Sequence, residues 1–180
     1  MIGTAGKHQQ KTVVDKIVTL SKNLEELERA IDKIQAWYNA FPIAKVCIGN
    51  HDAIVRRKAF DSGVSKVWIR DFDEVLGVEG WDFKEHHKIG GVLYVHGTGT
   101  SGRNAAAGKS LQFGCPVVQG HIHTEASVIY NGGHWGMQVG CGVDRDSYAM
   151  AYAKHFAKSY KLACGVVLNN GTLPIVIPFT

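Results

Sequence analysis

Residues 44–52 read AKVCIGNHD, a short apolar run that passes directly into a polar loop. Two later stretches repeat this arrangement, since residues 92–97 read VLYVHG and residues 116–123 read PVVQGHIH. The apolar runs are rich in β-branched residues and bounded by glycine, which predicts buried strands over Ala44–Ile48, Val92–Val95 and Pro116–Gln119. Ligands of open α/β sheets lie at the carboxyl ends of strands, so we expect the three polar loops to converge.

The rest of the chain alternates helical and strand patterns. Apolar residues recur at spacings of three and four from Leu24 to Phe41, which predicts an amphipathic helix capped by Asn23 and ended by Pro42. Further strands are expected over Ser127–Tyr130, Trp135–Val139, Cys164–Leu168 and Ile175–Ile177, and further helices over Ala53–Phe60, Ser101–Phe113 and Met150–Lys158. Helices between strands at the front and mostly strands at the back indicate a layered α/β fold, here a single domain over residues 1–180.

Length and composition narrow the class of protein. The 180 residues are 45% hydrophobic and 20% charged, with a formal net charge of +4. This composition is that of an ordinary globular domain, and the mild positive charge is compatible with an anionic substrate. The sequence contains no apolar run of the ~18 residues that cross a bilayer and no signal peptide pattern. Together with four cysteines and no CxxC pair, this predicts a cytoplasmic protein without a membrane partner.

The residues that follow the three strands are of types that bind divalent metals. Asn50, His96, His121 and His123 offer imidazole nitrogens and an amide oxygen, which suit zinc, manganese or iron. In an extended backbone, His121 and His123 would point the same way and could hold one ion or two neighbouring ions. His86 and His87 lie in a polar stretch and are interpreted as surface histidines.

The order of these motifs resembles the calcineurin-like metallophosphoesterase family. The resemblance rests on GNHD at residues 49–52, a strand that ends in HG at residues 96–97, and GHxH at residues 120–123. The stretch from His134 to Asp144 is similar to members of the family that are common in phage genomes. The resemblance covers about Leu24 to Phe179 and implies a β-sandwich flanked by helices.

The resemblance also implies roles for individual residues. Asn50, His96 and His121 would hold one of two divalent ions (Mn, Zn, Fe or Ni), and His123 would help to hold the other. A metal-bound hydroxide would attack phosphorus in a phosphomonoester or phosphodiester, such as a nucleotide or nucleic acid. His51 would be the general acid for the leaving oxygen, and Asp52 would orient His51. Arg103 and Lys109 are candidates to bind the substrate phosphate, with a solvated helix face as the alternative.

Two motifs of the family are not found in this sequence. These are Asp-x-His and Gly-Asp-x-x-Asp, and the only aspartates before Gly49 are Asp15 and Asp32. We therefore expect the chain to correspond to the carboxyl-terminal two-thirds of the family fold, without its first strands. A second polypeptide or another copy in a homo-oligomer would then supply the missing ligands. The host cytoplasm is the expected compartment if the gene belongs to a phage.

Two alternative functions remain open from the sequence. The chain could be a truncated, catalytically silent fragment or subunit that binds at most one metal or a partner. It could also be a structural zinc protein that uses His96, His121 and His123. Substrate turnover separates the enzyme from the silent fragment, and unfolding on zinc removal would indicate the structural role.

Overall fold

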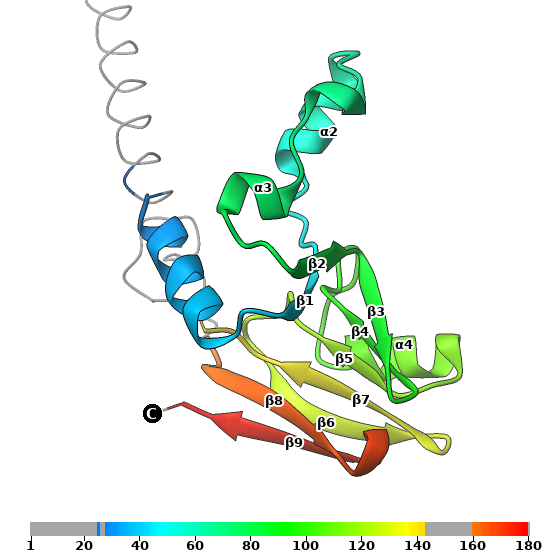
Figure 1. Ribbon diagram of the computed structural model, residues 1–180. Helices are drawn as coiled ribbons and strands as arrows, with labels where there is room; N and C mark the ends of the chain where they lie inside the picture. Colours follow the sequence, from blue (N-terminus) through cyan, green and yellow to red (C-terminus); the bar gives the residue numbers. More distant parts are fainter. Residues whose placement is uncertain (1–24, 26–27, 143–159, 180) are drawn as a thin grey trace, which may run out of the picture.

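The computed structural model describes residues 25, 28–142 and 160–179, and these form an α/β fold with mixed sheets and no closed barrel (Figure 1). The first described helix covers residues 28–40, within the predicted amphipathic helix. The expected capping residue Asn23 and the predicted helix Met150–Lys158 lie outside the described residues. None of the described helices is long and apolar enough to cross a membrane.

Within the described residues, the predicted strands and helices are present, with small shifts at their ends. Val92–Val95 is a strand with the predicted bounds, whereas the helix predicted from Ser101 begins only at Ala105, because Gly102 turns the chain with φ +83°. The described strands are β1 (Ala44–Cys47), β2 (Trp81–Lys84), β3 (His86–Ile89), β4 (Val92–Val95), β5 (Val117–Gln119), β6 (Ala126–Asn131), β7 (His134–Val139), β8 (Ala163–Leu168) and β9 (Leu173–Pro178); the named helices are α2 (Ile54–Asp61), α3 (Phe72–Leu76) and α4 (Ala105–Phe113), with single 3-10 turns at Lys66–Trp68 and Asn169–Gly171.

The largest sheet has five strands in the order β3-β4-β5-β7-β6. The three central strands β4, β5 and β7 run parallel, and the edge strands β3 and β6 pair antiparallel to their neighbours. Helix α4 covers one face of this sheet, and the β8–β9 hairpin covers the other (Figure 1). The carboxyl ends of β4 and β5 therefore lie at one edge of the sheet, directly before the loops that carry His96 and His121.

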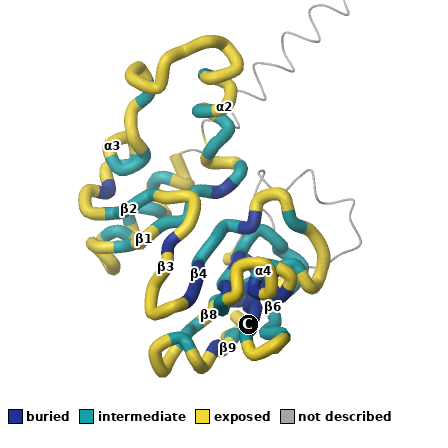
Figure 2. The backbone as a smooth tube through the Cα atoms, turned by 90° about the vertical axis from the view of Figure 1, so that its right-hand side faces the viewer, coloured by how far each residue is buried: buried dark blue, intermediate teal, exposed yellow. Residues whose placement is uncertain are grey.

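The two faces of β7 explain how these layers pack. Gly136 faces α4, and an added Cβ there would lie 2.3 Å from the backbone of Ala106 and Ala107, so only glycine permits the helix to approach so closely. The next residue, Met137, points to the opposite face and is fully buried in a cluster with Val92 and Trp135. Figure 2 shows buried segments along β4 and around α4. Alternation along one strand thus serves both the helix layer and the second sheet.

Strands β1 and β2 form a separate two-stranded parallel sheet beside the larger one. Side chains hold β1 against its neighbours, since Cys47 Sγ donates to the Tyr94 carbonyl at 3.3 Å and His87 Nε2 lies 3.2 Å from the Val46 carbonyl. His87 is only 5% exposed, so its interpretation as a surface histidine is wrong, while His86 is exposed. The sequence did not predict the two strands in residues 81–89, because charged side chains alternate with half-buried aromatic ones in β2 and His87 is the one buried side chain of β3.

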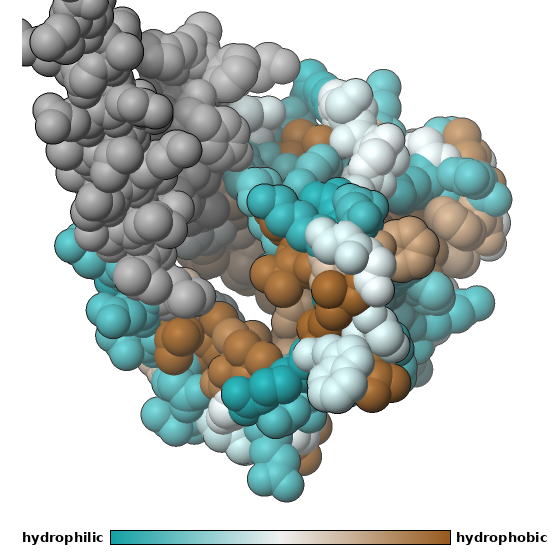
Figure 3. All heavy atoms as spheres, turned by 90° about the horizontal axis from the view of Figure 1, so that it is seen from above, coloured by the Kyte–Doolittle hydropathy of each residue, from teal (hydrophilic) through white to brown (hydrophobic). Residues whose placement is uncertain are grey.

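The segment from α2 to α3 extends away from both sheets (Figure 1). Arg56 ties its two helices together, because its guanidinium pairs with Asp71 at 2.9 Å and lies 4.2 Å from the centre of the Phe72 ring. Seen from above relative to Figure 1, the surface carries apolar side chains interspersed with hydrophilic ones (Figure 3). Phe60, Val67 and Trp68 in this segment are each more than 80% exposed.

Candidate metal centre

Three loops from three strands bring Asn50, His96 and His121 together. Asn50 follows β1, His96 follows β4 directly, and His121 follows β5. His96 Nε2 lies 2.8 Å from Asn50 Oδ1 and 3.2 Å from His121 Nδ1, and the two imidazole rings meet edge to face with centres 5.0 Å apart. Residues 46 and 25 positions away from His96 thus place two further metal-binding atoms within hydrogen-bond distance of its Nε2.

Glycines that follow the ends of β1 and β4 allow the loops of the cluster to approach one another. A Cβ on buried Gly49 would lie 3.0 Å from both Asp52 Oδ2 and His96 Cε1. Gly97 has φ +105°, and a Cβ there would lie 2.6 Å from the Gln119 side chain. Gln119 is fully buried and donates to Thr100 Oγ1, which in turn donates to the Gly97 carbonyl at 2.6 Å. The backbone that carries His96 is therefore fixed on both sides.

The loop after β5 differs from the extended backbone expected for His121 and His123. His121 has φ +66°, and Ile122 N donates to the Gly120 carbonyl at 2.7 Å, so the chain turns between the two histidines. The expectation that both side chains point the same way from an extended backbone is therefore wrong. The His123 ring instead packs beside Tyr160, with ring centres 6.0 Å apart.

Asp52 also has a different partner from the one expected. Its Oδ2 accepts a 2.7 Å hydrogen bond from the Gly49 amide, which closes the GNHD loop on itself. The expected orienting bond to His51 is not formed, and the His51 side chain is exposed next to the cluster. Asp52 thus shapes the loop that presents Asn50 and His51.

The electrostatic environment favours neutral histidines. Burial, followed by the imidazole of His121, lowers the pKa of His96, while the Asp52 carboxylate acts in the opposite direction. Burial and the imidazoles of His121 and His51 likewise lower the pKa of His123. The neutral imidazole is the form that binds a metal ion.

The donor atoms in the described residues fit one metal ion better than two. Two nitrogens bound to one tetrahedral zinc at 2.0–2.1 Å lie about 3.3–3.4 Å apart, close to the 3.2 Å between His96 Nε2 and His121 Nδ1. The Asn50 oxygen supplies a third donor. No group of three His, Cys, Asp or Glu side chains suited to a metal occurs within residues 28–142 and 160–179. A two-ion centre is thus not completed by these residues alone.

The two predicted phosphate-binding cations lie in different places. Lys109 lines a cavity beside Asn50 and His96, whereas Arg103 does not line it. The Arg103 side chain is 77% exposed and lies 3.7 Å from Glu125. Arg57 lines the cavity and donates to the Asn50 carbonyl at 3.3 Å, although nothing in the sequence distinguishes it from its basic neighbours Arg56 and Lys58. Phe113 was not predicted as a site residue either, although it lies four residues after Lys109 and so shares the same side of α4.

No protein-family model, curated protein or solved structure matches this chain.

Proposed function

We propose that this chain is a metal-dependent hydrolase of phosphomonoesters or phosphodiesters, with a layered fold of the calcineurin-like metallophosphoesterase type. The observation that carries the proposal is the cluster of Asn50 Oδ1, His96 Nε2 and His121 Nδ1 at the ends of three strands. Its atom types and spacing suit a divalent ion such as Mn, Zn, Fe or Ni. Neutral histidines and neighbouring cations further support a metal that works on an anionic ester.

Asn50, His96 and His121 would hold this ion, and His123 lies near enough to contribute electrostatically. An ion held by His96 Nε2 would take the place of the direct contacts of that atom with Asn50 Oδ1 and His121 Nδ1, and it would require the neutral tautomer that carries no proton at Nε2. When bound, a divalent ion supplies Lewis acidity and lowers the pKa of a bound water. A second ion, which the resemblance implies, needs carboxylates from another copy of the chain or from a second polypeptide.

The chain's own residues supply the rest of the chemistry. His51 is exposed on the loop between Asn50 and Asp52 and donates a proton to the leaving oxygen. Asp52 holds this loop through the Gly49 amide. Arg57 and Lys109, on opposite sides of the neighbouring cavity, bind and orient the phosphate. These two cations thereby orient the ester relative to His51.

A second candidate function is a catalytically silent chain that binds one ion or a partner. The observation that favours it is the incomplete second site, because no group of three His, Cys, Asp or Glu side chains that could hold a metal occurs in the described part of the chain. Such a chain would retain metal and hydrolyse nothing.

The His51→Ala substitution tests the proposed function. The protein is loaded with Mn²⁺, Zn²⁺, Fe²⁺ or Ni²⁺, and hydrolysis of phenyl phosphate and diphenyl phosphate, whose phenolate leaving group benefits from protonation, is measured beside bound metal. We expect His51→Ala to lower turnover by about 100-fold or more while metal content stays unchanged. His134→Ala is the matched control, because His134 starts β7 at the end farthest from the cluster. Metal retention without any turnover would establish the silent candidate, and equal loss of metal and turnover in His51→Ala would refute the acid role.

A further inference from the structure

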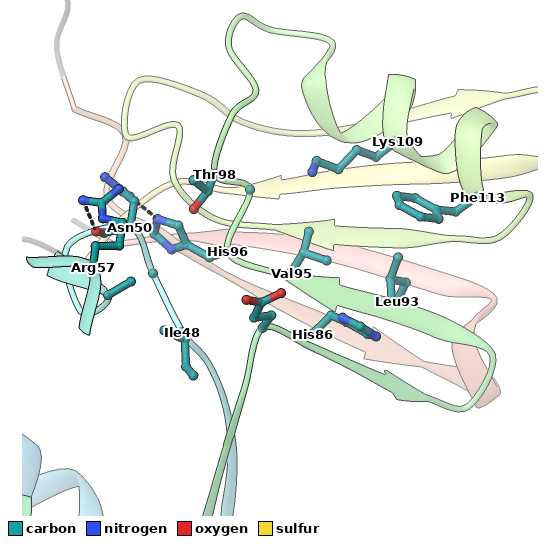
Figure 4. Close-up of a pocket in the computed structure, with 14 residues that line it drawn as sticks. Ile48, Asn50, Arg57, His86, Leu93, Val95, His96, Thr98, Lys109 and Phe113 are labelled. Carbon is teal, nitrogen blue, oxygen red and sulfur yellow. Dashed lines mark hydrogen bonds between the residues drawn. The ribbon is translucent and has the colours of Figure 1, made fainter. Parts of the chain in front are cut away.

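A cavity of about 570 Å³ opens beside Asn50 and His96. One wall comes from β1 and the start of α2, and the opposite wall comes from β4 and α4 (Figure 4). Small-molecule sites in proteins commonly have volumes of about 300–1,000 Å³. The cavity therefore has room for an organic ligand larger than a phosphate ion.

One end of the cavity is positively charged. Arg57 and Lys109 both line it, and in the described part of the chain neither forms an ion pair with a carboxylate. In Figure 4 the Lys109 side chain extends from α4 towards Thr98, on the side where Asn50 and His96 lie. Two cations that are not engaged in ion pairs attract an anion such as a phosphate.

The other end of the cavity is apolar. Leu93 and Val95 alternate along β4 and so share one face of the strand. Phe113 on α4 lies across from Leu93 (Figure 4), and 53% of its surface is exposed although it lines the cavity. An exposed aromatic ring opposite an aliphatic side chain offers a surface on which a flat ring can stack.

A carboxylate and a second polar side chain lie at the rim. Glu85 lines the cavity with His86 and, among the described residues, has no ion-pair partner. An ionised carboxylate only accepts hydrogen bonds, so Glu85 favours ligand groups that donate them, such as hydroxyl or amino groups. The cavity thus combines an anion end, a flat apolar end and an acceptor.

From these three features we infer that the cavity binds a nucleoside monophosphate. The phosphate lies between Arg57 and Lys109, the base lies against Phe113 and Leu93, and a sugar hydroxyl or base amino group donates to Glu85. A ring-free ester would leave Phe113 uncovered, and a simple aryl phosphate would leave Glu85 without a donor. This inference rests on the proposed function, because it names the substrate class of the same site.

Calorimetric titration of the chain in the presence of EDTA tests the inference without turnover. The probes are adenosine 5′-monophosphate, phenyl phosphate, glycerol 1-phosphate and inorganic phosphate. We expect the nucleotide to bind about tenfold or more tightly than glycerol 1-phosphate. Phe113→Ala should weaken nucleotide binding by about fivefold or more and leave glycerol 1-phosphate unchanged. Leu111→Ala is the matched control, because Leu111 lies on the same helix and is 52% exposed but does not line the cavity.

Charge variants test the other end of the cavity. Lys109→Gln should weaken the binding of every phosphate probe. Lys88→Gln should change the binding of none, and Lys88 is an exposed residue of β3. Glu85→Gln should weaken the binding of the nucleotide but leave the binding of phenyl phosphate unchanged. Equal affinity for nucleotide and glycerol 1-phosphate, or equal effects of Phe113→Ala and Leu111→Ala, would overturn the inference. Phenyl phosphate that binds as tightly as the nucleotide would overturn it in favour of an aryl phosphate.

The two proposals fail in different ways. Nucleotide binding that depends on Phe113, without turnover at any metal loading, would refute the hydrolase and keep the nucleotide cavity. Metal-dependent turnover without a preference for ring-bearing esters would keep the hydrolase and refute the nucleotide cavity.

Discussion

His96 Nε2 lies 2.8 Å from Asn50 Oδ1, although 46 positions separate the two residues. This contact joins the end of β4 to the loop after β1, which belongs to a different sheet. His121 extends the contact from the end of β5, with its Nδ1 3.2 Å from the same nitrogen. The candidate metal centre is therefore a product of tertiary structure, and it depends on the backbone that holds each strand end in place.

Gly97 is the residue on which the position of His96 most depends. Gly97→Ala should destabilise the protein by about 3 kcal/mol or more, because it combines φ +105° with a Cβ placed 2.6 Å from Gln119. Gly99→Ala is the control, since Gly99 has φ +81° but no atom within 4 Å of an added Cβ. It should cost only about 1–2 kcal/mol of backbone strain. Urea unfolding measures both, and equal losses would contradict the packing role of Gln119.

The contact between β7 and α4 makes a second glycine indispensable. Gly136→Ala should lower the free energy of unfolding by about 3 kcal/mol or more, since the added Cβ overlaps the backbone of Ala106 and Ala107. Gly108, inside α4, has open space around an added Cβ. Gly108→Ala should therefore raise the free energy of unfolding by about 1 kcal/mol through helix propensity. If Gly136→Ala and Gly108→Ala changed the free energy of unfolding in the same direction, α4 would not lie on β7 as described.

His87 is a buried, structural histidine, whereas its neighbour His86 is exposed. His87→Ala should cost about 2 kcal/mol, because it leaves the Val46 carbonyl without the imidazole partner at 3.2 Å. His86→Ala should change stability by less than about 0.5 kcal/mol, since that side chain is exposed. Thermal unfolding of the two variants provides the comparison. A larger loss for His86→Ala would contradict the described register of β3.

Cys47 reports on the contact of β1 with the larger sheet. Burial raises the pKa of its thiol above the ordinary 9.0, and a backbone hydrogen bond from His87 only partly offsets this. Since the thiolate is the reactive form, alkylation of Cys47 by iodoacetamide at pH 8 should be about tenfold slower in the folded chain than in urea. The folded rate should also continue to rise above pH 9, where the unfolded rate levels off. Peptide mass spectrometry follows each cysteine, and equal rates in both states would place Cys47 in solvent.

The sequence predicted the strands that lead into the site because their side chains are mostly apolar, with Lys45 and Gln119 as exceptions. VLYV at residues 92–95 is buried from both sides, by β3 and β5 as ladder partners and by the layers above and below. Convergence of the loops after β4 and β5 follows from their parallel pairing, since parallel strands end at the same edge. Strand β1 belongs to a different sheet, so strand order alone does not bring its loop to the site. Residues 81–89 were missed because charged side chains alternate with half-buried aromatic ones in β2, and the one buried side chain of β3 is His87.

Side-chain directions within the site were less accessible from sequence. A histidine with positive φ is uncommon, so nothing in GHIH predicts that His121 turns the chain and separates its ring from that of His123. Asp52 was expected to hold His51, but its carboxylate accepts a hydrogen bond from the Gly49 amide three residues earlier. Local hydrogen bonds of this kind compete with any longer-range role of an aspartate side chain.

Elemental analysis after loading with zinc or manganese and desalting counts the metal ions that Asn50, His96 and His121 retain. We expect one ion per chain in the parent protein and in His134→Ala, and no retained ion in His96→Ala/His121→Ala. Circular dichroism establishes that the double variant is folded. Equal metal content in the parent and the folded double variant, or no retained metal in the parent, would contradict the assignment of Asn50, His96 and His121 as a metal centre.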